Sequence, residues 1–365
     1  MKKTCKRVFI IDDSPVSRGV IKKVIASDPG LTLAGEAQDP YEAKDRLISA
    51  KPDVVTVDIQ MPKMDGITFL KFLMQQYPLP VVVISGNPNR VFDALDAGAV
   101  DFVAKPNIKK PKDLERFMES IAEKLHIASY AKSKRPLRKS GNAPIKGEER
   151  PRERVDGQKK EEKREGLLGR VDRTKVSLIA LGASTGGTET LLNIIKTFPK
   201  TMPPVLIVQH MPPVFTKTYA ERLNEHCELT IKEGEDGDLI LPGHGYVAPG
   251  GKMMTIKRVN NRLQLSCEER EKISGHIPSV DGLFLSIAEQ RGVAARSIGV
   301  ILTGMGFDGA KGLLELKKLG AFTIGQDEKT SVVYGMPRAA ASIGALSRQL
   351  PVGDIPKAIY DHIYP

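Results

Sequence analysis

The chain has 365 residues, of which 41% are hydrophobic, and a net charge of +11. This length exceeds that of a typical single domain, so we expect two domains with substantial buried cores. No apolar run is long enough to cross a membrane, and the start of the chain lacks the apolar core of a signal peptide. We therefore expect neither a transmembrane segment nor a secreted protein.

The three cysteines are few, odd in number and far apart, at Cys5, Cys227 and Cys267. They offer neither a disulfide framework nor a zinc site. Free thiols are typical of proteins in a reducing compartment, so the sequence predicts a cytoplasmic protein.

Residues 1–127 alternate between short apolar runs and helix-length segments with mixed faces, with Gly, Pro or Asp at the joints. This alternation predicts five βα repeats that build a parallel sheet with helices on both sides. The expected strands are Val8–Ile11, Leu31–Gly35, Val54–Ile59, Val81–Ser85 and Asp101–Ala104.

Polar side chains stand where these strands end. Asp12 and Asp13 follow the first strand and Asp58 closes the third. Three carboxylates in one crevice repel one another, and a hard divalent cation such as Mg²⁺ would relieve this repulsion. Ser85 and Lys105, at the ends of the fourth and fifth strands, could hold the oxygens of a phosphoryl group. Each aspartate could instead cap the next helix, but capping leaves the acidic doublet and Lys105 unexplained.

Residues 128–173 differ in composition from the chain on either side. The stretch from 131 to 175 holds 16 Lys or Arg against 8 Asp or Glu, which accounts for +8 of the net charge of +11, and it contains no aromatic residue. Such a segment cannot bury enough surface to fold, so it predicts a flexible, basic linker. A regulator that binds DNA through this segment is the alternative, disfavoured because no helix-turn-helix or stacking pattern accompanies it.

The segment Val176–Phe198 places a serine at a strand-to-helix turn. An apolar run ends in Gly182-Ala183-Ser184-Thr185-Gly186, and an amphipathic run follows. Glycines on both sides let the chain turn sharply and leave the hydroxyl of Ser184 clear at the edge of the sheet. A glycine-rich loop that binds phosphate is equally compatible with this motif alone, although a nucleotide loop would normally carry a lysine after its glycines.

A base and an orienting carboxylate are available for Ser184. Of the six histidines, only His210 closes a buried-strand pattern, 205–210, whereas His276 shows no signal of a partner. A third strand, 297–304, leads to Asp308. Because the carboxyl ends of parallel strands meet at one edge, Ser184, His210 and Asp308 are predicted to form a nucleophile, base and orienter. Singly, His210 could be a satisfied strand-end histidine and Asp308 a helix cap.

The first domain resembles the receiver domain of response regulators. The resemblance is carried by Asp12-Asp13, Asp58 to Pro62, Asp65-Gly66, Ser85 and Lys105-Pro106. It implies a flavodoxin-like doubly wound sheet, phosphorylation of Asp58 by a chemotaxis histidine kinase, and Mg²⁺ held by Asp12, Asp13 and Asp58, with Ser85 and Lys105 contacting the phosphoryl group.

The second domain resembles the catalytic domain of chemotaxis protein-glutamate methylesterases. Its matching motifs are GASTGGTE at 182–189, QHMPP at 209–213, GYVAPGG at 245–251, PSVDGLF at 278–284, TGMGFDGA at 303–310 and YGMPRAA at 334–340. The resemblance divides the chain into a receiver (1–127), a linker (128–173) and a catalytic domain (174–365). The expected fold class is therefore α/β, with two doubly wound parallel-sheet domains, the second of them Rossmann-like.

This resemblance implies a reaction and its partners. Ser184 would attack the γ-methyl ester of a glutamate on a methyl-accepting chemotaxis receptor, with His210 and Asp308 as base and orienter. Amides near Thr185 and Met305 are the expected oxyanion donors, and methanol would be released. Deamidation of receptor glutamine would need the same acyl chemistry. The esterase would need no cofactor, no nucleic-acid partner is expected, and the unphosphorylated receiver would cover the cleft.

The chain departs from the family pattern at a few positions. Gln60 stands where an acidic residue is usual, and Ser85-Gly86 replaces a pair richer in hydroxyls. Ile277 precedes Pro278 where a basic residue is expected. The last change bears on contacts to the substrate, and it leaves Ser184, His210 and Asp308 in place.

Overall fold

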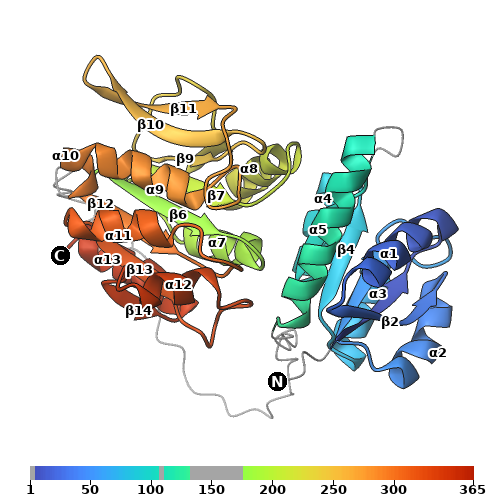
Figure 1. The fold of residues 1–365 in the computed structure, drawn as a ribbon. Coiled ribbons are helices and arrows are strands. Elements are labelled where there is room, and N and C mark those ends of the chain that lie inside the picture. Colours follow the sequence, from blue (N-terminus) through green and yellow to red (C-terminus); the bar gives the residue numbers. More distant parts are fainter. Residues whose placement is uncertain (1–4, 107–110, 132–175) are drawn as a thin grey trace, which may run out of the picture.

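A computed structural model describes residues 5–106, 111–131 and 176–365, which form two α/β units (Figure 1). Most of the predicted linker, from residue 132 to 173, lies outside the described residues. The first unit alternates strands with helices throughout. Its elements are β1 (Lys6–Ile11), α1 (Pro15–Ser27), β2 (Leu31–Ala37), α2 (Pro40–Ala50), β3 (Val54–Asp58), α3 (Gly66–Gln76), β4 (Val81–Ser85), α4 (Pro88–Asp96), β5 (Asp101–Ala104) and α5 (Pro111–Ser129).

The sheet of the first unit has the strand order β2-β1-β3-β4-β5, and all of its strand pairs are parallel. Helices α1 and α5 pack on one face and α2, α3 and α4 on the other. The strands are rich in Val and Ile because both faces of the sheet are covered. Several helices begin with a polar cap followed by proline, as at Ser14-Pro15 and Asp39-Pro40.

The second unit has more elements and includes an antiparallel hairpin. Its elements are β6 (Leu178–Ala183), α7 (Gly187–Ile195), β7 (Val205–Gln209), α8 (Phe215–His226), β8 (Thr230–Glu233), β9 (His244–Val247), β10 (Met253–Val259), β11 (Arg262–Glu268), α9 (Val280–Glu289), α10 (Arg291–Ala294), β12 (Ser297–Ile301), α11 (Ala310–Lys318), β13 (Phe322–Gln326), α12 (Met336–Ser342), β14 (Arg348–Leu350), the 3₁₀ helix η1 (Val352–Asp354) and α13 (Ile355–Ile363).

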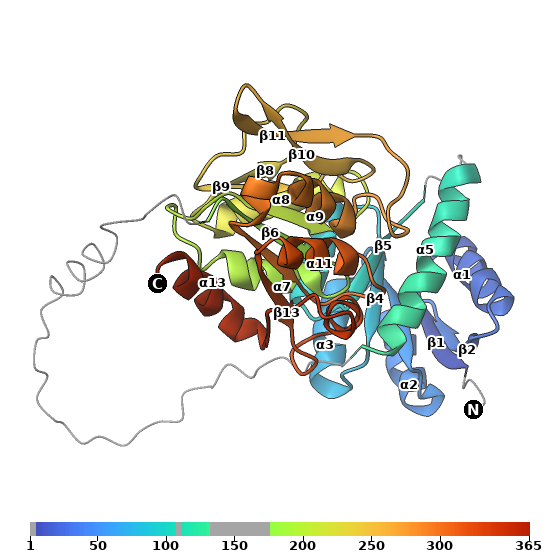
Figure 2. The same cartoon turned by 60° about the vertical axis from the view of Figure 1, so that its left-hand side comes forward.

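A seven-stranded sheet in the order β14-β13-β12-β6-β7-β9-β8 organises the second unit, and its strand pairs are parallel. Helices α7, α8 and α13 pack on one face, and α9, α11 and α12 on the other. The doubly wound parallel fold expected for both units is therefore confirmed. The β10–β11 hairpin, which the sequence did not predict, lies at the end of this unit away from α13 (Figures 1 and 2).

The strands that lead to the predicted triad end slightly earlier than expected. Strand β7 ends at Gln209 and β12 at Ile301, so His210 and the segment from Leu302 onward already belong to loops. The loop after β12 still follows β6, because the amide of Leu302 donates to the carbonyl of Gly182 at 2.9 Å. The functional side chains therefore extend from loop segments that are anchored to the sheet.

The two units pack against each other through α4 and β5 of the first and α7 and α8 of the second. Phe102 stacks on Phe215 with ring centroids 4.7 Å apart, and Phe92 stacks on Tyr219 at 5.6 Å. These side chains belong to one continuous apolar cluster that runs from one unit into the other. Within the parts of the chain that the structure describes, no helix combines the length and apolar character needed to cross a membrane.

Close packing of α9 against α11 generates a stability prediction. A Cβ at Gly312, on α11, would lie 2.6 Å from the Cβ of Phe284 on α9. We expect Gly312→Ala to lower the free energy of unfolding by about 1–3 kcal/mol. Gly19, inside α1, has no heavy atom within 4 Å of such a Cβ, so Gly19→Ala should raise it by about 0.5–1 kcal/mol. Urea unfolding of both variants measures the difference, and similar effects would contradict the packing described.

Candidate active site

Ser184 directly follows β6, in the turn that leads to α7. Its amide donates to the carbonyl of Thr303 at 3.0 Å, and its own carbonyl accepts from the amide of Gly187 and from the side chain of Gln209. Gly186 adopts a left-handed conformation (φ 74°), and a Cβ there would collide with Val332. The turn therefore needs glycine at this position, and it leaves the Ser184 side chain only 8% exposed.

His210 lies next to the Ser184 turn and is bonded to Asp308. The amide of His210 donates to the carbonyl of Ala183 at 3.3 Å, which fixes the loop after β7 beside the end of β6. The Nε2 atom of His210 is 2.8 Å from Oδ2 of Asp308. The Nδ1 atom is buried and has no hydrogen-bond partner in the described structure. When Nε2–H donates to the Asp308 carboxylate, Nδ1 is the nitrogen that can accept a proton.

The Asp308 carboxylate is buried among hydrogen-bond donors from the start of α9. It accepts from the amides of Val280 and Asp281 at 2.8 and 2.9 Å, and from the hydroxyl of Ser279 at 2.7 Å. Burial disfavours its charged form, but the bonds to His210 and to these donors outweigh it and hold the pKa of Asp308 below its usual value. A helix N-terminus thus keeps this carboxylate ionised beside the imidazole.

His276, for which the sequence shows no signal of a partner, packs against His210. Its ring stacks on that of His210, with centroids 3.9 Å apart and planes 11° from parallel. Burial, together with repulsion from His210, lowers the pKa of His276 to about 4, so the ring is neutral at physiological pH. His276 therefore covers the face of His210 without adding charge. Its sequence context, a turn with glycine beside it, carries no periodic signal that could have identified it.

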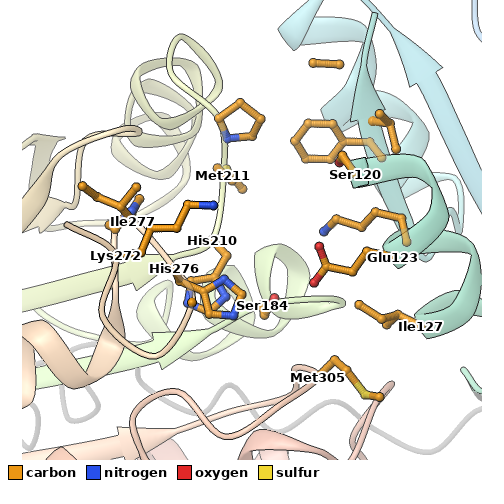
Figure 3. Close-up of a pocket in the computed structure, with 17 residues that line it drawn as sticks. Ser120, Glu123, Ile127, Ser184, His210, Met211, Lys272, His276, Ile277 and Met305 are labelled. Atoms are coloured by element: carbon orange, nitrogen blue, oxygen red, sulfur yellow. The ribbon is translucent and has the colours of Figure 1, made fainter. Parts of the chain in front are cut away.

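These residues line a cavity of about 500 Å³ that lies between the two units (Figure 3). In this view Ser184 lies beside the two imidazole rings, Met305 lies below them and Lys272 extends above them. Helix α5 of the first unit closes the opposite side with Ser120, Glu123, Lys124 and Ile127. Ile277 also lines the cavity but carries no charge, so Lys272 supplies a cation on the catalytic side.

The two backbone amides predicted as oxyanion donors come from loops at the end of the sheet. In the described parts of the chain, neither the amide of Thr185 nor that of Met305 donates a hydrogen bond. The Met305 side chain is 44% exposed and lines the cavity, whereas the side chain of Thr185 is buried. Both amides are thus available as donors near Ser184.

The predicted acidic cluster also comes together, at the carboxyl ends of β1 and β3. Carboxylate oxygens of Asp12, Asp13 and Asp58 lie within 4.8 Å of one another. Lys105 bridges to Asp58, with Nζ 2.5 Å from Oδ2. Burial raises the pKa of Asp12, and the charge of Asp58 adds to this effect, while hydrogen bonds from Ser17 and Ser14 oppose it. Mutual repulsion in this group favours a cation with oxygen ligands.

Two further positions singled out in the sequence lie around Asp58. The hydroxyl of Ser85 accepts from the amide of Asn87 at 3.1 Å and is almost fully buried at the end of β4. The backbone amide of Gln60 donates to Asp58 at 3.1 Å, while the Gln60 side chain is exposed. The change to glutamine at position 60 therefore leaves the main-chain contact to Asp58 intact.

A second group of charged side chains lies at the contact between the units. Arg222 on α8 forms an ion pair with Asp96, the last residue of α4. Glu189, in the first turn of α7, shares a hydrogen bond with Asp96. Burial and this contact with Asp96 raise the pKa of Glu189 to about 7, although the charges of Arg222 and Lys196 oppose the shift.

Comparisons with known proteins match both units. The CheB methylesterase family model matches residues 179–359, and the response regulator receiver domain model matches residues 8–118. A protein-glutamate methylesterase/protein-glutamine glutaminase of Syntrophomonas wolfei is 43% identical over 354 residues, 97% of this chain and 96% of the relative. An enzyme of the same name from Syntrophotalea carbinolica is 40% identical over 97% of each chain.

Among solved structures, the CheB methylesterase catalytic domain of Thermotoga maritima is similar to the second unit. It is 39% identical, covers 51% of this chain and 98% of its own length, and superposes with a TM-score of 0.49.

The bond between Asp308 and His210 predicts what happens when the charge of Asp308 is removed. In Asp308→Asn the amide can donate to Nε2 and so favours the tautomer with the proton on Nδ1. We expect the rate at which a fluorophosphonate labels Ser184 to fall by about 10⁴-fold, as when a triad histidine holds the wrong tautomer. Asp281→Asn is the control, because Asp281 bonds Ser274 and Gly312 instead of the imidazole. An equal loss in both variants would point to misfolding.

The raised pKa of Glu189 predicts a pH-dependent stability. Unfolded Glu189 ionises near 4.5 and the folded residue near 7, so the folded protein binds more protons between these values. The free energy of unfolding should therefore fall as pH rises from about 4.5 to about 7. Scanning calorimetry should show a smaller fall in Tm over this range for Glu189→Gln than for wild type. Glu225→Gln, on the exposed end of α8, is the control and should show the same fall in Tm as wild type. The same fall in all three proteins would show that Glu189 does not cause the pH dependence.

Proposed function

Because the chain belongs to the CheB methylesterase family, we propose that it hydrolyses glutamate γ-methyl esters on methyl-accepting chemotaxis receptors and that phosphorylation of Asp58 activates it. The observation that carries the proposal is that Ser184 and His210 line one cavity between the units and that Asp308 is bonded to His210. The free thiols of Cys5, Cys227 and Cys267 support action in the reducing cytoplasm.

Proton transfer in the first step follows from the tautomer of His210. Ser184 attacks the ester carbonyl while Nδ1 of His210 accepts the hydroxyl proton, because Nε2 is engaged by Asp308. The imidazolium that forms is stabilised by the ionised Asp308. The stacked and neutral ring of His276 holds the imidazole plane without competing for this proton. The same Nδ1–H then protonates departing methanol and leaves an acyl-enzyme.

Charge that develops on the carbonyl oxygen needs donors close to Ser184. The unbonded amides of Thr185 and Met305 are suited to this role, and the start of α7 adds a favourable dipole at Thr185. Water, deprotonated by His210, releases the acyl group as glutamate. Receptor glutamine would pass through the same acyl-enzyme with ammonia as leaving group, in agreement with the glutaminase activity in the names of the relatives.

The receiver is proposed to bind Mg²⁺ through Asp12, Asp13 and Asp58. The donor set fits, because three mutually repelling carboxylates offer only oxygen ligands to a hard cation. When bound, the ion would neutralise charge around the phosphoryl group. Asp58 accepts the phosphoryl group from a chemotaxis histidine kinase, Lys105 is placed to pair with its oxygens, and Ser85 lies at the neighbouring strand end.

Regulation follows from the position of the receiver over the cavity. Helix α5 and strand β5 line the side of the cavity opposite Ser184, so the packed receiver takes up space through which a receptor segment would approach. Phosphorylation needs only to favour a second arrangement in which this contact is broken. The described contact area combines two aromatic stacks with a few polar bonds, and such a contact can be opened by a change at one face of the receiver.

The decisive experiment measures methanol release from membranes that carry radiolabelled, methylated chemoreceptors. We expect release by wild type to increase severalfold with acetyl phosphate and Mg²⁺. Asp58→Asn should show no such increase, because the phosphoryl acceptor is missing, while Ser184→Ala should release no methanol under either condition.

The two variants separate catalysis from its control. Stimulation that persists in Asp58→Asn would disprove activation through this residue while leaving the esterase intact. Methanol release that persists in Ser184→Ala would disprove the role of Ser184 as the nucleophile. The matched control is Ser286→Ala, which changes a buried serine on α9 that bonds only within the catalytic unit.

A further inference from the structure

Asp101, the first residue of β5, is a buried carboxylate whose bonds cross from the receiver to the catalytic unit. It is 6% exposed. Its Oδ1 atom accepts from the amide of Phe102 at 2.8 Å, and its Oδ2 atom accepts from Nζ of Lys124 at 2.7 Å. The same Oδ2 atom also accepts from the hydroxyl of Thr185 in the catalytic unit. The bonds from Phe102 and Lys124 lie within the receiver, and the bond from Thr185 is the one that crosses to the catalytic unit.

Thr185 is the residue after the proposed nucleophile, and its backbone is tied into the catalytic loop. Its carbonyl accepts from the hydroxyl of Thr303 at 3.0 Å. The carbonyl of Thr303 in turn accepts from the amide of Ser184 at 3.0 Å. A bond to the Thr185 side chain therefore restrains the loop that carries Ser184. It also places a charged, buried acceptor next to the residue that follows the catalytic serine.

We propose that Asp101 is a latch: its bond to the Thr185 hydroxyl holds the unphosphorylated receiver over the active site and restrains the Ser184 loop. This inference rests on the proposed function only in that the covered site is the esterase site. The latch is supported by the neighbouring residue, since Phe102 stacks on Phe215 and places Asp101 against the catalytic unit.

The position of Asp101 in the receiver links the latch to the phosphorylation site. Strand β5 has four residues, with Asp101 at its start and Lys105 directly after its end. Lys105 is bonded to Asp58. Any movement of Lys105 toward a phosphoryl group on Asp58 acts on the strand that carries Asp101, because a short extended segment transmits displacement along its axis.

Lys124 makes the latch reversible. Its ammonium is bonded to Asp101 within the receiver and stays with it when the units separate. The carboxylate consequently keeps a charged partner in the open state, and opening does not leave an unpaired buried charge. The Thr185 hydroxyl loses its carboxylate partner at the same moment.

The test measures how fast a fluorophosphonate labels Ser184 in the full chain without phosphodonor. Labelling needs an open cavity, so its rate is proportional to the fraction of molecules in which the receiver has moved off the cavity. We expect Asp101→Asn and Thr185→Val each to raise the rate about ten-fold. This corresponds to a loss of about 1.4 kcal/mol from the free energy that favours the closed arrangement. The double variant should rise no further than the single ones, because both remove the same bond.

Two controls separate the latch from other effects. Asp96→Asn breaks the more exposed interdomain ion pair with Arg222 and should change the rate less than two-fold. Ser286→Ala removes a buried hydroxyl on α9 that bonds Ile256 and Leu283 and should leave the rate unchanged. If Thr185→Val impairs Ser184 itself, Asp101→Asn decides the question, since it alters no residue of the catalytic unit.

The labelling rates test the latch, and methanol release tests the proposed substrate. A rate in Asp101→Asn that stays within two-fold of wild type, or effects of the two variants that multiply, would overturn the proposal. If receptor methanol release fails in wild type but the labelling rates change as expected, the latch stands and the proposed substrate is wrong. Full methanol release by wild type, with labelling rates that are unchanged in the Asp101 and Thr185 variants, would support the esterase and disprove the latch.

Discussion

The buried charge of Asp308 is the constraint on which the catalytic unit depends. A carboxylate without exposure to water is costly unless donors surround it, and here the first amides of α9, the Ser279 hydroxyl and His210 all point at it. The position of α9 is in turn set by its close packing on α11, where glycine at position 312 permits the approach. The orientation of one histidine thus rests on how two helices pack.

The same arrangement decides which nitrogen of His210 is left without a partner. Asp308 engages Nε2, so Nδ1 is left buried and unbonded toward the cavity. His276 stacks on the ring and, because burial lowers its pKa, adds no charge there. An imidazole held by a carboxylate on one side and a neutral ring on its face has few ways to turn. The orientation of the His210 ring is therefore fixed while the two units are packed together.

Control is built from contacts that are individually modest. The receiver meets the catalytic unit through contacts that include two aromatic stacks, the bonds of Asp96 to Arg222 and Glu189, and the Asp101–Thr185 bond. A contact of this kind can be closed at rest and still respond to one phosphoryl group, because a change of a few kcal/mol moves the equilibrium. Strand β5 lies between the two sites: Lys105, directly after its end, is bonded to Asp58, and Asp101, at its start, is bonded to Thr185.

The sequence by itself determined the two parallel α/β units and the residues at their strand ends. Buried runs of Val and Ile, glycine-flanked turns and polar strand ends are local patterns, and parallel strands bring such ends to one edge; Ser184, His210 and Asp308, like Asp12, Asp13 and Asp58, were identified in this way. Only the tertiary structure decided that His276 stacks on His210, that a hairpin completes the second unit and that Asp101 reaches Thr185. Each of these depends on residues far apart in the chain whose local sequence is unremarkable, because a contact across a domain boundary leaves no periodicity in either segment.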